Sequence, residues 1–214
     1  MLKRLALLAL LMLIGVSAAA PRADADALPV LKPGSKGAAA KEVQFRLLTA
    51  GYFKGSLTAV YGRTTRKAVI AFQRSHGLSA DGIVGPRTWA KLKKTTVNRS
   101  ELYLLARVIH AEARGESFKG QVAVGAVIMN RLKSPRFPKT VKGVILERNA
   151  FSAVRDGQIR LNPGSTAFKA AKAAVRGADP TGNALYYYNP TIARSAWFKS
   201  RTATKRIGNH LFAV

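Results

Sequence analysis

Hydrophobic residues recur three and four positions apart in three short stretches of the first half of the chain. These stretches are 38–50, 65–75 and 86–93. Such spacing predicts amphipathic helices. Gly51 and Gly77 follow the first two, and Pro86 opens the third at a position where its missing N–H costs nothing. With Trp89 and Leu92 facing inward, the pattern predicts a small three-helix domain.

A weak internal repeat precedes two of these helices. The tetrad Gly-x-x-Thr occurs at 62–65 and again at 85–88. Threonine hydroxyls accept hydrogen bonds at helix starts, so Thr65 and Thr88 are expected to cap the second and third helices.

The second half of the chain carries two stronger helical patterns. A polar stretch over 95–99 predicts a short linker with little room for independent motion. Ser100 is then expected to cap a helix that begins with Glu101. Ser117 is expected to cap the next helix, which runs to Leu132 and is apolar over much of its circumference. We therefore predict that this second helix lies at the centre of its domain.

An acidic residue continues the apolar face of the helix that begins at Glu101. Glu112 follows Val108 and Ile109 at helical spacing, where another apolar residue is expected. Burial disfavours the charged form of a carboxylic acid, which is the condition for donating a proton to a glycosidic oxygen. Gly115 is expected to end the helix, so that Glu112 borders a cleft.

Structural alternatives stay open for the polar residues of this region. Glu112 could instead be paired with Arg107 or another of the many basic residues, since structural ion pairs also involve half-buried acids. Glu116 could share the site, but its place at the start of the next segment favours a structural role. Gln121 and Asn130 interrupt an apolar helix and could either bind a glycan or tie loops together as buried amides.

A strand is predicted over 184–189, where three tyrosines follow one another. Side chains alternate along a strand, so Tyr187 should oppose Tyr186 and Tyr188. Aromatic rings stack on sugar faces, and one side of the strand is therefore a candidate wall of the cleft. Asn189 either contributes to that wall or shapes the following turn.

Composition adds a location and a partner. Lys3 and Arg4, an apolar run over 5–16 and small residues after it predict a secretory signal over 1–27, too short to span a bilayer as a helix. No stable membrane span is expected after its removal. The 214 residues carry a formal charge of +26, which favours a polyanionic partner. Export favours an acidic cell wall over nucleic acid, although a basic surface kept for solubility has the same composition.

The residue inventory also excludes several chemistries. The chain has no cysteine, which rules out every thiol nucleophile. His110 and His210 are the histidines of the second half and form no recognisable zinc spacing, so we predict neither a metal nor a cofactor. His210 could orient a group in the site, or be a satisfied structural residue.

Residues 30–94 resemble the helical peptidoglycan-binding module, which we assign to 28–94. The matching residues are Gln44, Leu47, Gly51, Tyr61-Gly62, Thr65, Phe72-Gln73, Gly77-Leu78, Asp81 to Gly85 and Thr88. The sequence departs from the module at Ala59, where the family often has Asp, and a missing loop contact or cap is expected there.

Residues 100–214 are similar to the spore cortex-lytic cell wall hydrolase family. The matching segments are 111–116, 120–124, Asn130-Arg131, 151–154, 156–159, 184–190, Trp197, 207–210 and Phe212. The resemblance implies a mainly α fold with a minor β element, similar to lysozyme and lytic transglycosylases. It also implies that Glu112 is the catalytic acid for the bond from N-acetylmuramic acid to N-acetylglucosamine.

The resemblance and the strand pattern together give a substrate-binding set. Its members are Phe151, Ser152, Gln158, Tyr188, Asn189 and His210. A retaining hydrolase needs a second carboxylate close to the first, and acids other than Glu112 are few in this domain. A lytic transglycosylase needs one acid. We therefore predict transglycosylation, in which the muramoyl 6-hydroxyl closes on the anomeric carbon and gives a 1,6-anhydro end.

The resemblance further implies action on peptidoglycan glycan strands in the spore cortex during germination. We also predict a monomer, with an accessory germination protein as a possible partner. The expected location is outside the cytoplasmic membrane, in the cell wall or in the cortex and coat region. Two alternatives are a glycosidase that remodels vegetative walls and a non-catalytic peptidoglycan-binding protein.

Overall fold

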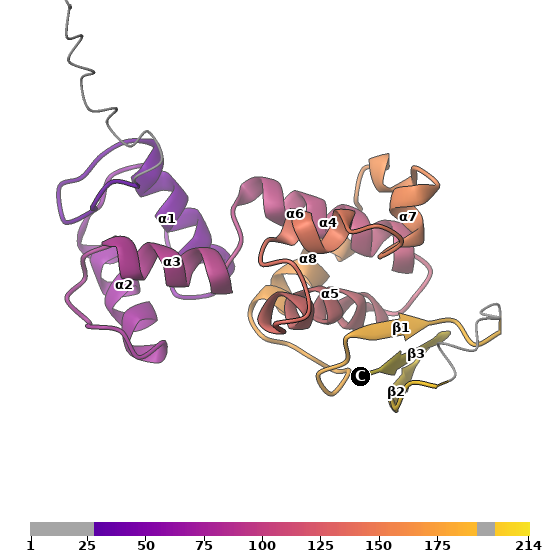
Figure 1. Cartoon of the computed structure of the whole chain (residues 1–214). Helices are drawn as coiled ribbons and strands as arrows, with labels where there is room; N and C mark the ends of the chain where they lie inside the picture. The colour runs from indigo at the N-terminus through magenta and orange to yellow at the C-terminus, as the bar shows by residue number, and fades with distance from the viewer. Residues whose placement is uncertain (1–27, 192–199) are drawn as a thin grey trace, which may run out of the picture.

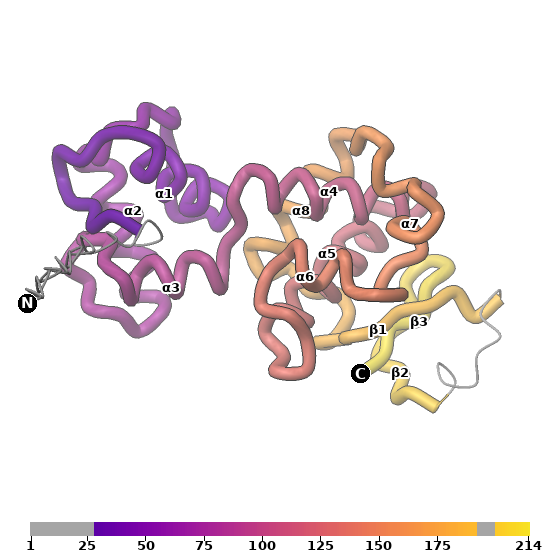
Figure 2. The backbone as a smooth tube through the Cα atoms, turned by 45° about the horizontal axis from the view of Figure 1, so that its top comes forward, coloured from indigo at the N-terminus to yellow at the C-terminus, as the bar shows by residue number. Residues whose placement is uncertain are grey.

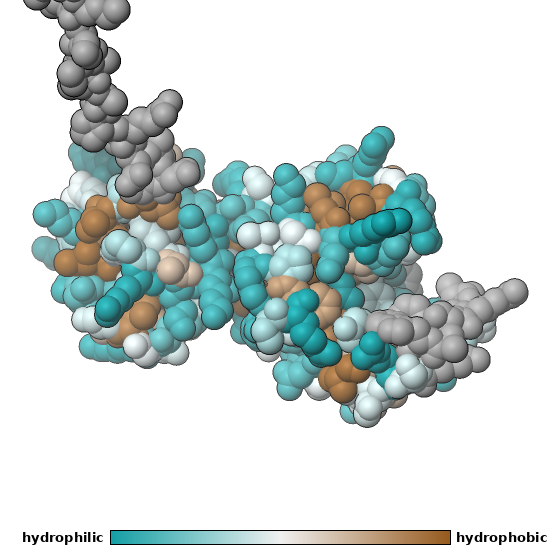
Figure 3. Space-filling model, in the orientation of Figure 1, coloured by the Kyte–Doolittle hydropathy of each residue, from teal (hydrophilic) through white to brown (hydrophobic). Residues whose placement is uncertain are grey.

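The computed structural model describes residues 28–191 and 200–214 and arranges them in two lobes (Figures 1 and 2). The predicted signal over 1–27 and Trp197 lie outside the described residues. Within the described ranges, no helix has the length and apolar content needed to cross a membrane. Hydrophilic residues cover most of the face drawn in Figure 3, with smaller hydrophobic patches on both lobes.

The N-terminal lobe is the predicted three-helix domain. Its helices are α1 (Ala38–Thr49), α2 (Arg63–Ser75) and α3 (Pro86–Thr95). They enclose one hydrophobic core in which Tyr61, Phe72 and Leu92 are fully buried. Trp89 is buried as expected, and Pro86 occupies the first turn of α3. The helix predictions are confirmed to within two residues at each end.

The prediction that threonines cap α2 and α3 is wrong. The N-cap residues are Gly62 and Gly85, and neither helix start has a side-chain cap. Thr65 and Thr88 are buried instead, and each hydroxyl accepts a hydrogen bond from a glutamine amide. The threonine therefore recurs in the two tetrads because each one is hydrogen-bonded to a buried glutamine.

The two glutamines make equivalent bonds. Gln44 donates to Thr65 Oγ1 at 3.0 Å and accepts from Ala59 N at 3.1 Å. Gln73 donates to Thr88 Oγ1 at 3.2 Å and accepts from Gly82 N at 2.9 Å. A buried amide satisfied on both sides fixes each loop against the helix that follows it. The internal repeat of the sequence is thus a repeat of one buried hydrogen-bond unit.

The equivalence of the two loops corrects the prediction made for Ala59, where the sequence departs from the peptidoglycan-binding module. Ala59 takes the place of Gly82, and both have positive φ, 59° and 74°. The residue equivalent to Asp81 is Thr58, one position earlier, and its hydroxyl lies 3.3 Å from Val60 N, as the Asp81 carboxylate lies near Ile83 N. The loop contact is therefore kept by a hydroxyl, and the departure at Ala59 is one of backbone conformation.

The C-terminal lobe is mainly helical with a small antiparallel sheet, as predicted. Its elements are α4 (Arg99–Ala113), α5 (Phe118–Lys133), α6 (Val141–Leu146), α7 (Ser152–Arg155), the short 3₁₀ helix η1 (Gln158–Arg160), α8 (Ser165–Val175), β1 (Tyr186–Tyr188), β2 (Ala203–Ile207) and β3 (His210–Ala213). The strands lie in the order β1-β3-β2. Every residue of α5 from Gly120 to Leu132 is buried, so this helix is central as expected. Ser117 caps it through a bond from Gly120 N.

The junction between the lobes differs from the predicted linker over 95–99. The helix α3 continues through Thr95, and α4 begins at Arg99 with Asn98 as its N-cap, so the prediction of Ser100 as the cap is wrong. Asn98 Oδ1 accepts from Glu101 N at 2.8 Å, and Glu101 Oε2 accepts from Asn98 N at 2.7 Å. This reciprocal pair is a capping box, which only a residue three positions before Glu101 can form.

The end of α1 is docked on the C-terminal lobe. The buried guanidinium of Arg46 donates to Thr96 O at 3.1 Å and lies 3.4 Å from Glu101 Oε2. From the other lobe, Arg176 Nε donates to Thr49 O at 3.1 Å. These bonds join α1, the start of α4 and the end of α8, which holds the lobes in a fixed relation.

Candidate active site

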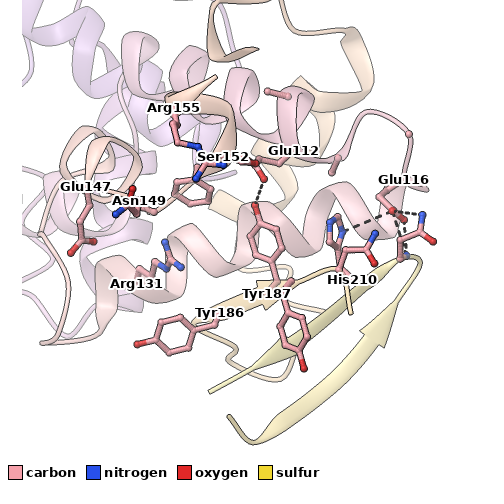
Figure 4. A pocket seen from close by; sticks show the side chains of 18 of the residues that line it. Glu112, Glu116, Arg131, Glu147, Asn149, Ser152, Arg155, Tyr186, Tyr187 and His210 are labelled. Atoms are coloured by element: carbon pink, nitrogen blue, oxygen red, sulfur yellow. Dashed lines mark hydrogen bonds and ion pairs between the residues drawn. The ribbon is translucent and has the colours of Figure 1, made fainter. Parts of the chain in front are cut away.

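Glu112 lies in the last turn of α4, at the edge of a cavity of about 890 Å³. The helix ends at Ala113, so the carboxyl group projects where the chain turns toward α5. The walls of the cavity come from α4, α5, the loop before α7, and β1 with the β2–β3 turn (Figure 4). The predicted position of Glu112 beside a cleft is therefore confirmed.

Three hydrogen bonds fix the Glu112 carboxyl group. Ser152 Oγ and Ala153 N lie 3.0 and 2.8 Å from Oε1, and the Tyr187 hydroxyl lies 3.0 Å from Oε2. Among the described residues no ion pair involves Glu112, so the alternative pairing with Arg107 is wrong. Both carboxyl oxygens are thus oriented by neutral donors.

Tyr187 is the neutral donor that comes from the sheet. Desolvation by burial, followed by the nearby charge of Glu112 and their hydrogen bond, holds the pKa of Tyr187 well above its usual value of 10.0. The phenol therefore keeps its proton and donates a hydrogen bond to Glu112 across the whole neutral range.

Phe151 and Ser152 lie at the start of α7, as the resemblance implies for one wall of the cleft. Phe151 is buried, and its ring lies 5.1 Å from the guanidinium carbon of Arg131 and 6.4 Å from the Tyr187 ring. Ser152 is exposed at the cavity and contacts Glu112 directly. The wall is therefore built around the acid.

Glu116 also lines the cavity, and its hydrogen bonds agree with the structural role that its position in the sequence favours. Its Oε1 accepts from Asn209 Nδ2 at 3.0 Å, and its oxygens lie 3.4 Å from Asn209 N. Gly208 makes this possible, because a Cβ there would come within 1.8 Å of Glu116 Oε2. In Figure 4 the Glu116 side chain is turned toward the β2–β3 turn, with His210 and Tyr187 between it and Glu112.

His210 stands between these two acids. Its Nδ1 is 3.9 Å from Glu116 Oε1, and its ring meets the Tyr187 ring edge-on at 5.1 Å. Burial lowers the pKa of His210 below 6.5, although the two glutamates oppose that shift. The imidazole is therefore mostly neutral near pH 7 and packs against the phenol that holds Glu112.

Tyr188 and Asn189 line the same cavity, where the strand prediction puts them. Asn189 Oδ1 also accepts from Thr191 N at 2.9 Å, so this residue shapes the turn as well.

The predicted substrate-binding set differs from the structure at Gln158, because this residue is not among the described residues that line the cavity. Its amide is held outside the cavity by Arg114 Nη1 at 2.9 Å and by Asp156 Oδ2 at 3.1 Å. Sequence resemblance could not reveal this, since Arg114 lies 44 positions from Gln158 along the chain.

The amides of α5 follow the structural alternative. Asn130 Nδ2 donates to Asp179 Oδ2 at 2.8 Å and to Ala184 O at 3.2 Å. Gln121 Nε2 donates to Glu116 O at 3.2 Å. Both are buried and tie loops to the central helix.

Several cavity residues were missed by sequence reasoning, among them Tyr187 and Arg131. The strand pattern predicts that Tyr187 opposes Tyr186 and Tyr188, yet all three line the cavity, so alternation alone does not indicate that Tyr187 contacts Glu112. Arg131 lies on the otherwise apolar α5, and a cation on a buried face was the signal that could have found it. Within 28–191 and 200–214, no group of three or more acids and histidines is arranged to hold a metal ion.

Comparisons with known proteins agree with both lobes. Residues 115–213 match the family described as Cell Wall Hydrolase, and residues 36–92 match the one described as Putative peptidoglycan binding domain. A spore cortex-lytic enzyme of Bacillus cereus is 39% identical over 221 positions, which cover 86% of this chain and 85% of that protein.

Solved structures give the same result for the C-terminal lobe. The catalytic domain of the SleB protein of Bacillus cereus is 52% identical with a TM-score of 0.53, covering 55% of this chain and 91% of that one. The catalytic domain of the germination-specific lytic transglycosylase SleB of Bacillus anthracis is 51% identical with a TM-score of 0.53, covering 55% and 97%.

Proposed function

Because this chain belongs to the cell wall hydrolase family of the spore cortex-lytic enzymes, we propose that it cleaves the bond from N-acetylmuramic acid to N-acetylglucosamine, with Glu112 as catalytic acid. That the chain is a cell wall-degrading enzyme follows from the family itself. The observation that carries the assignment of Glu112 is its carboxyl group, held by three neutral donors at the edge of a cavity large enough for sugars.

The proposed reaction is a lytic transglycosylation in which one carboxyl group does both proton transfers. Glu112 gives its proton to the glycosidic oxygen as the bond to the muramoyl anomeric carbon breaks, and the N-acetylglucosamine hydroxyl leaves. The carboxylate then takes the proton of the muramoyl 6-hydroxyl, whose oxygen closes on the anomeric carbon. The product is a 1,6-anhydro end, and no water is consumed.

The surroundings of Glu116 support a mechanism with one acid. A retaining hydrolase would use a second carboxylate as nucleophile on the opposite face of the sugar. Glu116 is the nearest candidate on the sequence, but Asn209 occupies its oxygens and Gly208 lies against them. Glu147 also lines the cavity, but in Figure 4 it lies beyond Arg131, away from Glu112. The role of Glu116 under this proposal is to fix the β2–β3 turn, which carries His210 at its end.

The proposed substrate contacts line the cavity around Glu112. Phe151 and Ser152 form one wall, and Tyr188, Asn189 and His210 form the other. Aromatic faces and amide groups at these positions suit sugar rings and their N-acetyl groups.

Two variants test the assignment. Glu112→Gln keeps the shape of the side chain but has no acidic proton to donate. A suspension of purified walls should therefore stay turbid with this variant. Glu116→Gln keeps an oxygen for Asn209 and should retain cleavage. Mass spectra of the digest should contain 1,6-anhydro ends, and a digest with only reducing ends contradicts transglycosylation. Persistent cleavage by Glu112→Gln would favour the alternative of a non-catalytic binding protein.

The spore cortex is the proposed substrate, on the strength of what the relatives are named for. Residues 28–94 are the proposed wall-binding module and residues 100–214 the proposed catalytic domain. The proposed signal over 1–27 exports the chain, which acts as a monomer with an accessory germination protein as possible partner. Parallel digestion of cortex and of lactam-free vegetative sacculi tests the substrate. Equal rates on both would favour a vegetative remodelling glycosidase.

A further inference from the structure

Arg131 places a positive charge at the end of the cavity away from Glu116, with the charge of Glu147 near enough to oppose the lowering of its pKa by burial. Arg131 comes from α5, is 6% exposed and lines the cavity. Figure 4 shows its guanidinium between Tyr186 and the loop that carries Asn149. Neither the assigned acid chemistry nor the sugar walls use this group.

The described protein groups satisfy the guanidinium only in part. Arg131 Nε donates to Leu185 O at 2.8 Å, while Nη1 is buried and has no hydrogen-bond partner among the described residues. None of the ion pairs in the described part of the chain includes Arg131. A buried cation without a paired anion is costly, and burial accordingly lowers the pKa of Arg131.

Aromatic rings supply the remaining compensation. The guanidinium carbon lies 5.1 Å from the ring centres of Phe137 and Phe151 and 5.7 Å from that of Tyr186. Rings attract a cation through their faces, but an N–H···π contact is weaker than a hydrogen bond to an oxygen acceptor. The cluster therefore holds a charged, incompletely bonded donor in a fixed position beside the cavity.

Accepting the proposed function, we propose that Arg131 is a specificity residue that recognises the acyl oxygen of the muramoyl lactyl arm. N-acetylglucosamine and N-acetylmuramic acid differ only by this arm, so a donor directed to it distinguishes the two sugars. The oxygen can belong to a lactam, to the amide of a stem peptide or to a free carboxylate. All three accept hydrogen bonds from a guanidinium, and the carboxylate also pairs with its charge.

The test compares two oligosaccharides of equal length, one with muramoyl residues and one made of N-acetylglucosamine alone. Binding is measured by calorimetry in the full chain carrying Glu112→Gln, so that nothing is cleaved. Adding Arg131→Met, which keeps an apolar side chain of similar length, should lower affinity for the muramoyl ligand about 10- to 100-fold, the range for a hydrogen bond to a charged group. Affinity for the other ligand should stay within about 2-fold.

Arg107→Met is the matched control. Arg107 also has a buried Nε without a partner and lies over an aromatic ring, Tyr103, but it is outside the set of described residues lining the cavity. It should leave the ratio of the two affinities unchanged. Arg131→Lys, which keeps the charge and loses the planar fork, should restore part of the preference and serves as the second variant if Arg131→Met does not fold.

The outcomes separate this inference from the proposed function. A ratio of affinities that Arg131→Met leaves unchanged, or an equal loss for both ligands, overturns the role of Arg131, even where Glu112→Gln abolishes cleavage. Cleavage by Glu112→Gln overturns the proposed function instead. Repeating the measurement with lactam, peptide-bearing and free-carboxylate muramoyl ligands identifies the source, because the loss is largest for the form that Arg131 binds.

Discussion

The Tyr187 hydroxyl donates a 3.0 Å hydrogen bond to Oε2 of Glu112, across 75 positions of sequence. The bond joins the edge strand of the small sheet to the last turn of α4. It orients the carboxyl group toward the cavity through a residue that cannot itself ionise in the neutral range. Tyr187 is thus a positioning residue for the proposed acid.

Tyr187→Phe is expected to lower kcat on purified peptidoglycan about 10- to 100-fold with little change in KM, because a hydrogen bond to a charged group contributes about 1.5–3 kcal/mol. Tyr103→Phe is the control, since the Tyr103 hydroxyl bonds Asn162 at 3.0 Å on the exposed surface. A purely structural role for Tyr187 predicts lower thermal stability with unchanged kcat, and that result would contradict the positioning role.

Gly208→Ala should be more destabilising than Gly177→Ala. Both glycines have positive φ, 56° and 96°, so an alanine is strained at either. At Gly208 the new Cβ also meets Glu116 Oε2 at 1.8 Å, whereas nothing lies within 4 Å at Gly177. Denaturant unfolding should give a loss about 1–3 kcal/mol larger for Gly208→Ala, the cost of a displaced buried carboxylate. Equal losses would mean that Glu116 moves freely.

Ala59→Gly should stabilise the N-terminal lobe. Relief of the left-handed conformation at Ala59 gains about 1–2 kcal/mol, and the greater freedom of glycine in the unfolded chain offsets about 0.5–1 kcal/mol of it. Ala90→Gly, at an exposed position of α3, should have the opposite sign and cost about 1 kcal/mol. A decrease in the unfolding midpoint of Ala59→Gly would contradict the conformational argument.

Alkaline pH should weaken the N-terminal lobe through Tyr61. Burial raises the pKa of Tyr61 above its usual 10.0, and the charge of Asp81 adds to the shift. The folded lobe therefore retains this proton where the unfolded chain loses it, so the stabilisation is complete below pH 10 and falls as the pH rises beyond it. Urea midpoints between pH 8 and 11 should fall less steeply for Tyr61→Phe than for the unsubstituted chain, because the variant lacks this phenol. The lysines titrate equally in the two proteins, so their contribution to the slope cancels in the comparison. Identical slopes would exclude Tyr61.

Local features of this fold could be predicted from the sequence. The spacing of Leu105, Val108 and Ile109 decides which face of α4 is buried, and Gly51 ends α1 because a left-handed residue closes the helix there. Such features depend on neighbours within one or two turns. The central position of α5 followed equally from its apolar circumference.

Features that depend on distant partners could not be predicted. The cap of α4 is a different case, because the capping box selects Asn98 over Ser100 by a local spacing of three residues to Glu101 that the sequence already contains. Thr65 has the position and residue type of a helix cap, but its hydroxyl accepts a hydrogen bond from Gln44, 21 positions away, and is buried there. The contact of Glu112 with Tyr187 required the pairing of β1 with β3, which no pattern along the chain specifies.

The docking of α1 through Arg46 and Arg176 determines how the proposed enzyme can work on an anchored polymer. A chain held on a glycan strand by its N-terminal lobe presents the Glu112 cavity at one offset and one orientation. It reaches only those bonds that lie at that spacing from the anchoring point. To cleave more distant bonds, the whole molecule must dissociate from the wall and rebind. Turnover on intact sacculi therefore depends on how long the N-terminal lobe stays bound.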